Sequence, residues 1–242
     1  MIKFSVLIPT YNNLNYLKLA IDSIKHNSIY EHEIILHIND GSDGTLNYAK
    51  NNNLIYTHSS ENIGLCSAIN KASGKVSTEY VLYVHDDMYL CKNWDQILED
   101  EIKSLDNDLF YFSGTNYEAR DIDMRFNPGN SPEQFNPNDF FNFCMTKNEK
   151  DLQGSHWAPH IISKRLWDVV GGFSEEFNPG DGSDPDFCMK LWNNKVRIFK
   201  SIDKFKVFHF GSTTTRKKNV IKNNGTKKFL LKYGFNPKFF RK

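Results

Sequence analysis

Short apolar runs alternate with helix-spaced apolar positions over the first half of the chain. Strand-like runs occur at residues 4–8, 33–38, 54–57 and 80–84, and each ends at a polar or turn-forming group. Between them, residues 14–24, 45–50 and 65–72 carry apolar side chains at the spacing of one helix face. Strands that alternate with short helices are typical of right-handed crossover units. The pattern therefore predicts an α/β fold, with a Rossmann-like, mostly parallel central sheet flanked by helices.

The second half of the chain is less regular. Helix-spaced positions recur at residues 94–105, 163–170 and 186–193, and strand-like runs at 109–113, 196–199 and 205–208. Residues 116–150 are rich in Asn, Pro and Phe and show no period, yet the aromatic cluster at 140–143 argues against disorder. We interpret this segment either as an insertion that covers bound substrate or as part of the packed structure. The length predicts one domain over residues 1–215, with a nucleotide-binding half over residues 1–115.

Polar side chains stand where the predicted N-terminal strands end. Parallel strands bring their carboxyl ends to one rim of the sheet, where open α/β sheets bind ligands. A stacking ring, a carboxylate that accepts from a base N–H, and amide and hydroxyl groups together suit a nucleobase and its ribose. Ordinary turn chemistry also places such residues after strands, so the interpretation depends on the whole set. The candidate nucleotide-binding residues are Pro9, Thr10, Tyr11, Asp40, Asn62, Gly64 and Asp86.

Two adjacent carboxylates, Asp86 and Asp87, follow the apolar run at residues 80–84. They repel each other unless a cation or ligand donors compensate their charge. One explanation is a divalent ion between protein and substrate phosphates, and the other is a helix cap. Further along, an apolar strand ends in His209, whose imidazole suits Mn²⁺-like ions and could complete a site begun by Asp87. Packing is the competing explanation for a histidine in an aromatic run.

A second acidic group lies at residues 180–187, where glycines and a proline predict a sharp turn before a helix. A general base requires a carboxylate presented toward the substrate, and Asp184 fits that better than Asp181, with Asp186 as the alternative. Helix capping is the competing explanation, because a helix N-terminus stabilises carboxylates. Upstream, His156 and Trp157 precede another strand. A tryptophan face either stacks on the apolar side of a sugar ring or packs in the core.

Charge and cysteine content limit the functional classes. The 30 basic and 29 acidic residues nearly cancel, so the net charge of +1 names no partner. Residues 216–242 form a basic tail without an acidic residue, which indicates either peripheral contact with an anionic membrane or a solvated charge run. Four scattered cysteines fit a reducing compartment, and neither a signal peptide nor a membrane span is evident, so we expect a cytoplasmic protein. The absence of GxxxxGKS/T and of GxGxxG after the first strand disfavours P-loop and dinucleotide-binding enzymes.

The motifs follow one another in a specific order along roughly residues 3–211. They are Val6-Leu7-Ile8-Pro9-Thr10-Tyr11-Asn12, Asn39-Asp40-Gly41-Ser42, Glu61-Asn62-Ile63-Gly64, Asn70-Lys71-Ala72, Asp86-Asp87, Gly171-Gly172-Phe173, Asp184-Pro185-Asp186-Phe187 and Val207-Phe208-His209. This order resembles glycosyltransferase family 2, which has the GT-A fold. The resemblance implies an inverting enzyme that uses Mn²⁺ or Mg²⁺ and moves a sugar from a nucleoside-diphosphate sugar to a hydroxyl acceptor. UDP is the nucleotide that the family favours, with dTDP and GDP as alternatives. The acceptor would be a glycan, a lipid-linked molecule or a protein.

Carried over position by position, the resemblance assigns roles. Thr10, Tyr11 and Asp40 would contact the nucleoside. Asp87 and His209 would bind the metal, and Asp184 would be the base. His156 and Trp157 would line the acceptor or sugar pocket of an acceptor-side half over residues 116–215. Three departures stand out: His85 replaces the first acid of the DxD-type motif, Asn39 replaces one of two usual acids in a loop that is one residue short, and Ser183 replaces the acid before the base, which leaves Asp184 and Asp186 open as candidates.

Two other functions compete with glycosyl transfer. A sugar nucleotidyltransferase would use a similar α/β half, but it needs a basic glycine-rich loop where residues 9–13 have neither glycine nor a cation. A catalytically degenerate sugar-nucleotide or glycan-binding module would explain the irregular His85, although Asp87, Asp184 and His209 together argue against it. No nucleic-acid partner is expected, because the basic tail lacks regular aromatic interleaving.

Overall fold

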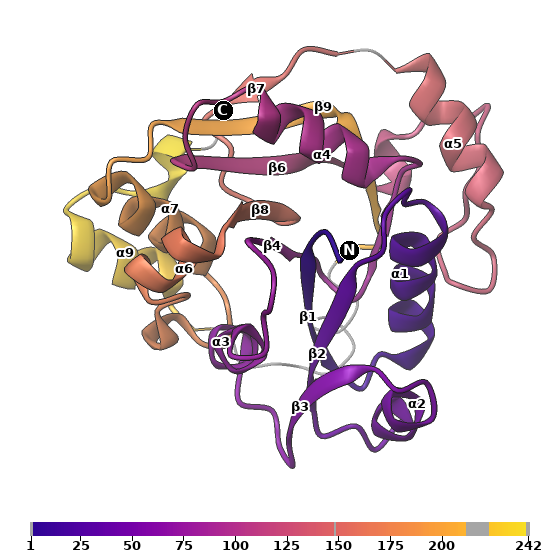
Figure 1. Ribbon diagram of the computed structural model, residues 1–242, viewed down its shortest axis with the longest axis horizontal. Coiled ribbons are helices and arrows are strands. Elements are labelled where there is room, and N and C mark those ends of the chain that lie inside the picture. The colour runs from indigo at the N-terminus through magenta and orange to yellow at the C-terminus, as the bar shows by residue number, and fades with distance from the viewer. Residues whose placement is uncertain (1, 148, 212–222, 241–242) are drawn as a thin grey trace.

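A nine-stranded sheet organises the part of the chain that the computed structural model describes, residues 2–147, 149–211 and 223–240 (Figure 1). Its strands are β1 (Ser5–Tyr11), β2 (Glu33–Asn39), β3 (Ile55–Ser59), β4 (Tyr80–Tyr83), β5 (Met88–Leu90), β6 (Phe110–Tyr117), β7 (Leu152–Gln153), β8 (His160–Ser163) and β9 (Ile198–His209). Their order across the sheet is β3-β2-β1-β4-β8-β6-β9-β5, and β7 pairs with β9.

The N-terminal half of the sheet is parallel, as the alternating pattern predicts. β1 pairs in parallel with both β2 and β4, and β2 pairs in parallel with β3. Helix α3 (Leu65–Ser73) lies on one side of these strands, and α1 (Leu14–His26) and α2 (Thr45–Asn51) lie on the other (Figure 1). Because both faces are covered, β2 is buried along its whole length, which explains its nearly continuous apolar run.

Beyond β4 the sheet is mixed. β8 pairs antiparallel with β4 and β6, β6 runs parallel to β9, and β5 and β7 run antiparallel to β9. The helices of this half include α4 (Trp94–Lys103), α6 (Lys164–Val170), η2 (Glu175–Phe177) and α7 (Ser183–Asn193). The predicted strands at 196–199 and 205–208 are one strand, β9. The polar middle of β9 carries the irregularity: the neighbours Gly114 and Thr115 of β6 pair with Ile202 and Lys206, so residues 203–205 of β9 have no partner in β6.

The segment at residues 116–150 is packed against the sheet. After η1 (Ala119–Asp121) it forms α5 (Pro137–Thr146), in which Phe140 and Phe143 are fully buried. The ring of Phe135 lies 4.7 Å from that of Tyr89 and 5.1 Å from that of Phe208, between centroids. Of the two interpretations of this segment, the packed structure is therefore confirmed, and closure over a substrate stays a prediction.

The C-terminal segment also contacts the domain. Residues 216–222 and 241–242 of the predicted basic tail lie outside the described residues, but α9 (Gly225–Tyr233) packs beside α7 and is followed by η3 (Pro237–Phe240). Lys232 forms ion pairs with Glu176 at 2.6 Å and with Asp186 at 2.7 Å. The domain boundary at residue 215 and the membrane contact stay predictions. None of the helices in the described ranges is long and apolar enough to cross a membrane.

Candidate functional site

The acidic pair lies at the sheet edge where β4 meets the loop after β1. Thr10 Oγ1 donates to Asp86 Oδ2 at 2.7 Å, and Asn13 Nδ2 donates to Asp86 Oδ1 at 3.2 Å. Burial and the neighbouring charge of Asp87 raise the pKa of Asp86 to about 7, although the two hydrogen bonds favour its ionised form. Asp86 therefore joins the end of β4 to the β1–α1 loop. The sequence pattern predicted that these segments share one rim of the sheet, but not that Asp86 would form these hydrogen bonds.

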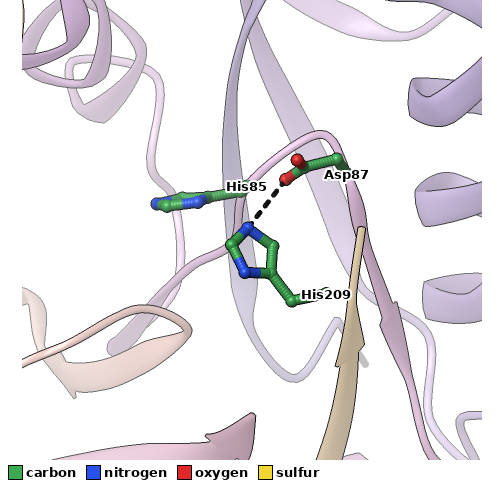
Figure 2. A group of neighbouring side chains, drawn as sticks. All are labelled: His85, Asp87 and His209. Carbon is green, nitrogen blue, oxygen red and sulfur yellow. Dashed lines mark ion pairs between the residues drawn. The ribbon is translucent and has the colours of Figure 1, made fainter. Parts of the chain in front are cut away.

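Three side chains with metal-binding atoms meet beside this pair. His85, Asp87 and His209 each present one donor atom, and these atoms all lie within 4.8 Å of one another (Figure 2). The backbone fixes Asp87 beside His209, because β5 pairs with β9 in a register that sets Met88 opposite His209, and Phe210 N donates to Asp87 O at 3.0 Å. The predicted partners Asp87 and His209 are thus neighbours, joined by an ion pair of 3.3 Å.

The two imidazoles differ in pKa because their surroundings differ. Burial and the nearby His209 lower the pKa of His85 to about 4, so this ring is neutral near pH 7 and keeps a nitrogen lone pair. Burial opposes protonation of His209, but Asp87, Glu118 and Asp86 outweigh it and raise the pKa of His209. A set of two imidazoles and one carboxylate fits a divalent ion. From the sequence, His85 was noted only as a departure from the first acid of the DxD-type motif. Its position two residues before Asp87 was the signal that could have identified it as a third candidate ligand.

The predicted nucleoside contacts surround the ends of β1 and β2. Asp40 has a left-handed backbone with φ of 61°, and its Oδ2 accepts from Asn12 Nδ2 at 2.7 Å. Asn12 is itself left-handed, with φ of 47°, and its Oδ1 accepts from Gly41 N at 2.8 Å. Tyr11, the last residue of β1, is half-buried next to them. Asn12 thus connects the ends of β1 and β2 at this rim, a role that was not predicted from the sequence.

Asn62 and Gly64 show a structural role at this rim. Asn62 Oδ1 accepts from Gly64 N at 3.0 Å, which closes a tight turn before α3. Gly64 has φ of +84°, and a Cβ there would lie 2.5 Å from Asn178 Oδ1. That oxygen accepts from Cys66 N at 2.9 Å and so caps α3. The glycine therefore allows the C-terminal half of the chain to approach the rim.

A polar cavity of about 350 Å³ adjoins the rim. It opens between the β1–α1 loop and the segment at residues 131–133, and Asn15 Nδ2 donates to Glu133 Oε1 across this boundary at 3.1 Å. The packed insertion thus borders the candidate nucleotide side of the site. The lining residues are Asn12, Asn13, Leu14, Asn15, Tyr16, Asp43, Ser131, Pro132 and Glu133.

The two candidate bases in the first turn of α7 have different surroundings. Asp186 is fully buried and bound, because Tyr233 Oη donates to its Oδ1 at 2.8 Å and Lys232 lies 2.7 Å from the same oxygen. Each of the two carboxyl groups has one buried oxygen without a hydrogen-bond partner in the described residues, Oδ1 of Asp184 and Oδ2 of Asp186, and no side chain is seen to bind the other oxygen of Asp184. Burial raises the pKa of Asp184 to about 7. Asp184 is therefore poised to take up a proton near neutral pH, whereas Asp186 anchors α9.

Tyr83 links Asp184 to the acidic pair. It is fully buried at the end of β4, and its hydroxyl has no hydrogen-bond partner in the described part of the chain. Burial raises its pKa well above the ordinary value, and the charges of Asp184, Asp86 and Asp87 add to that effect. Asp184 at the start of α7 and the acidic pair after β4 are thus near enough to Tyr83 for their charges to affect its hydroxyl.

His156 and Trp157 precede β8 on the same side. The antiparallel register sets Tyr83 opposite His160, so the residues before His160 lie near those that follow Tyr83. Trp157 Nε1 donates to Gly114 O at 2.9 Å, which fixes the half-buried indole, and the His156 ring lies 5.5 Å from it between centroids. The position suits a pocket wall, and contact with a sugar stays a prediction.

Comparison with known proteins identifies similar chains. The model of glycosyl transferase family 2 matches residues 5–160. A hyaluronan synthase from Pasteurella multocida is 27% identical over 229 residues, covering 91% of this chain but only 22% of that protein. The crystal structure of S. aureus TarS 1–349 with UDP-GlcNAc matches with a TM-score of 0.61 at 18% identity, covering 88% of this chain and 61% of that one. The mannosyltransferase PcManGT from Pyrobaculum calidifontis, in complex with GDP-Man and Mn²⁺, matches with a TM-score of 0.61 at 17% identity, covering 87% and 57%.

Proposed function

The chain belongs to glycosyl transferase family 2, and from this premise we propose that it is an inverting glycosyltransferase. It moves a sugar from a nucleoside-diphosphate sugar to a hydroxyl group of a glycan, lipid-linked or protein acceptor. The main support for the proposal is the cluster of His85, Asp87 and His209 beside the strand-end rim, together with the buried carboxyl oxygen of Asp184. A direct displacement requires a sugar donor held beside the metal site and a base that accepts the proton of the acceptor hydroxyl.

The proposed base is Asp184. Its carboxylate takes the proton of the acceptor hydroxyl while that oxygen bonds to the anomeric carbon, and the bond from this carbon to the diphosphate breaks. The nucleoside diphosphate leaves with the bonding electron pair, and the configuration at the anomeric carbon inverts. A buried, unpartnered carboxyl oxygen with a pKa raised to about 7 supports this role. Asp186 is less suited, because Tyr233 and Lys232 already hold it.

The donor would lie along the rim formed by β1, β2 and the end of β4. Tyr11 offers a ring for the base, and Asp40 an acceptor for a base N–H. Each oxygen of Asp86 accepts one hydrogen bond and keeps lone-pair capacity for a ribose hydroxyl. We propose UDP as the nucleotide, with support from the fold shared with TarS, whose structure contains UDP-GlcNAc. The loop with Asn62 and Gly64 would close the base side.

We assign Mn²⁺ or Mg²⁺ to the set of His85, Asp87 and His209. When bound there, the ion would neutralise charge on the diphosphate leaving group. His85 was the main support for a degenerate binding module, and its place within the donor set weakens that alternative. His156 and Trp157 are the proposed walls of the acceptor or sugar pocket, since an indole face packs well against sugar C–H groups.

The proposal is tested by ligand binding followed by product analysis. Thermal unfolding with UDP, GDP, dTDP and CMP, each with and without Mn²⁺, should show a metal-dependent rise in Tm for one diphosphate. Sugar release from the matching donor, and the anomeric configuration of the product by ¹H NMR, then test transfer with inversion. Asp184→Asn should bind donor but not transfer, whereas the exposed control Asp168→Asn should retain activity. No Tm shift with any nucleotide, or full turnover by Asp184→Asn, would contradict the proposal.

A further inference from the structure

In the part of the chain that the structure describes, His85 contacts its neighbours only through its ring. Its half-buried ring contacts those of Tyr83 and His209, with centroids at 5.3 and 5.7 Å. Within the described residues, neither of its ring nitrogens forms a hydrogen bond or an ion pair. Its donor atom nevertheless lies within 4.8 Å of those of Asp87 and His209, and Figure 2 shows the three side chains together. An imidazole whose nitrogens form no hydrogen bond within the described residues is suited to be a ligand.

The other two donors are held by the sheet. The antiparallel pairing of β5 with β9 fixes the backbone of Asp87 beside that of His209. Asp87 and His209 are also largely enclosed, with side chains 4% and 14% exposed. Glu118 Oε1 lies 3.9 Å from His209 Nδ1, on the opposite ring nitrogen from Asp87, so that His209 turns its Nε2 toward Asp87. The sheet pairing thus positions two of the three donors, and the composition of the cluster decides which ion fits.

We propose that His85 makes this a site of two imidazoles and one carboxylate that selects a first-row transition ion, such as Mn²⁺ or Co²⁺, and binds Mg²⁺ poorly. This inference rests on the proposed function in taking the cluster as the metal site. Mg²⁺ prefers an octahedral shell of oxygen ligands and gives up its water reluctantly. Imidazole nitrogen is a softer donor, and the affinity of such sites rises from Mn²⁺ through Co²⁺. An acid at position 85 would instead give an oxygen-rich site that accepts either ion.

Metal binding without any sugar nucleotide tests the selection directly. Free Mn²⁺ is measured by its aqueous EPR signal as protein is added, and Mg²⁺ and Co²⁺ are then used as competitors. We expect the wild type to prefer Mn²⁺ over Mg²⁺ by about a hundredfold or more, and His85→Asp to reduce that preference by about tenfold or more. The matched control is His26→Asp, which makes the same exchange at an exposed histidine at the end of α1 and should leave the preference unchanged.

Three outcomes would overturn the inference. These are equal affinity of the wild type for Mg²⁺ and Mn²⁺, no binding of Mn²⁺, and an unchanged preference in His85→Asp. If His85→Asp does not fold, as judged by circular dichroism, His85→Gln removes the imidazole without adding charge and should weaken Mn²⁺ binding more than Mg²⁺ binding. A protein that selects Mn²⁺ through His85 yet transfers no sugar would keep this inference and refute the proposed function. Sugar transfer with no ion preference would do the reverse.

Discussion

Replacement of Asp184 by Asn should stabilise the protein while removing its activity. Burial raises the pKa of this carboxyl from 3.8 to about 7, so the folded protein holds the proton more tightly than the unfolded chain does. The stability that comes from this proton is present below pH 3.8 and is lost as the pH rises toward 7. Asn cannot ionise, so the variant avoids that loss.

The size of the effect follows from the shift. About three pKa units correspond to about 4 kcal/mol in the free energy of unfolding, at about 1.4 kcal/mol per unit. Two effects reduce this figure. The side chain is only partly enclosed, and the N-terminus of α7 favours the carboxylate by about 0.3–1 kcal/mol. We therefore expect Asp184→Asn to be about 1–3 kcal/mol more stable than the wild type at pH 8.

Urea unfolding at pH 4, 6 and 8 in metal-free buffer measures this difference. The advantage of the variant should grow between pH 4 and pH 7 and then level off. The control Asp168→Asn, at an exposed position on α6, should stay within about 0.5 kcal/mol of the wild type at every pH. Transfer by Asp184→Asn should fall about 10²–10⁴-fold. A variant that is less stable at pH 8, or a difference that does not change with pH, would refute the burial of an ionised Asp184.

Three further predictions concern the same region. Transfer at saturating metal should increase as the pH rises through about 7, because Asp184 must be ionised to accept a proton; kcat/KM measured between pH 5 and 9 checks this. Lys232→Met should lower the free energy of unfolding by about 1–3 kcal/mol, because it removes the cation beside the fully buried Asp186, and partial exposure of Lys232 keeps the loss below that of a fully buried pair. Gly64→Ala should cost about 1–3 kcal/mol, since φ of +84° disfavours a side chain and its Cβ would meet Asn178 at 2.5 Å; thermal melting measures both.

Matched variants serve as controls for these changes. Lys227→Met removes an exposed lysine of the same helix, and Gly74→Ala adds a methyl group where the nearest atom is 3.5 Å away. Both should change stability by less than about 0.5 kcal/mol. Equal losses in test and control variants would mean that the contacts with Asp186 and Asn178 do not decide stability. A flat activity profile down to pH 5 would argue against Asp184 as the base.

The local pattern of apolar and polar positions predicts the parallel half of the sheet because each strand there is an apolar run between turns. The pattern fails where contacts between distant segments determine the secondary structure. Phe140 and Phe143 show no clear helical period, yet they are fully buried in α5 because aromatic rings from distant segments surround them. Likewise β5 is only three residues long and exists because it pairs with β9. Such pairings between distant segments leave no local signal.

The candidate site divides in the same way. The strand-end residues Asp40, Asp86 and Asp87 were predictable because parallel strands share a rim. The contacts that hold Asp186 were not, since they come from Lys232 and Tyr233 of α9, which lies far along the chain from α7. The role of His85 was hidden for a similar reason. A histidine in place of an acid gains meaning only when His209 is known to lie beside it.

The pairing of β5 with β9 also has a consequence for how the protein is made. His85 and Asp87 leave the ribosome well before His209, which is the last residue of β9, so the three donors cannot meet until β9 has been synthesised. The parallel strands β1–β4 can form from closer segments, and the long-range pairs of β9 should form later. An ion that needs all three donors then binds a nearly finished fold. Such an ion should slow unfolding without accelerating folding. The metal content of a purified sample would then indicate how much of the protein has completed folding.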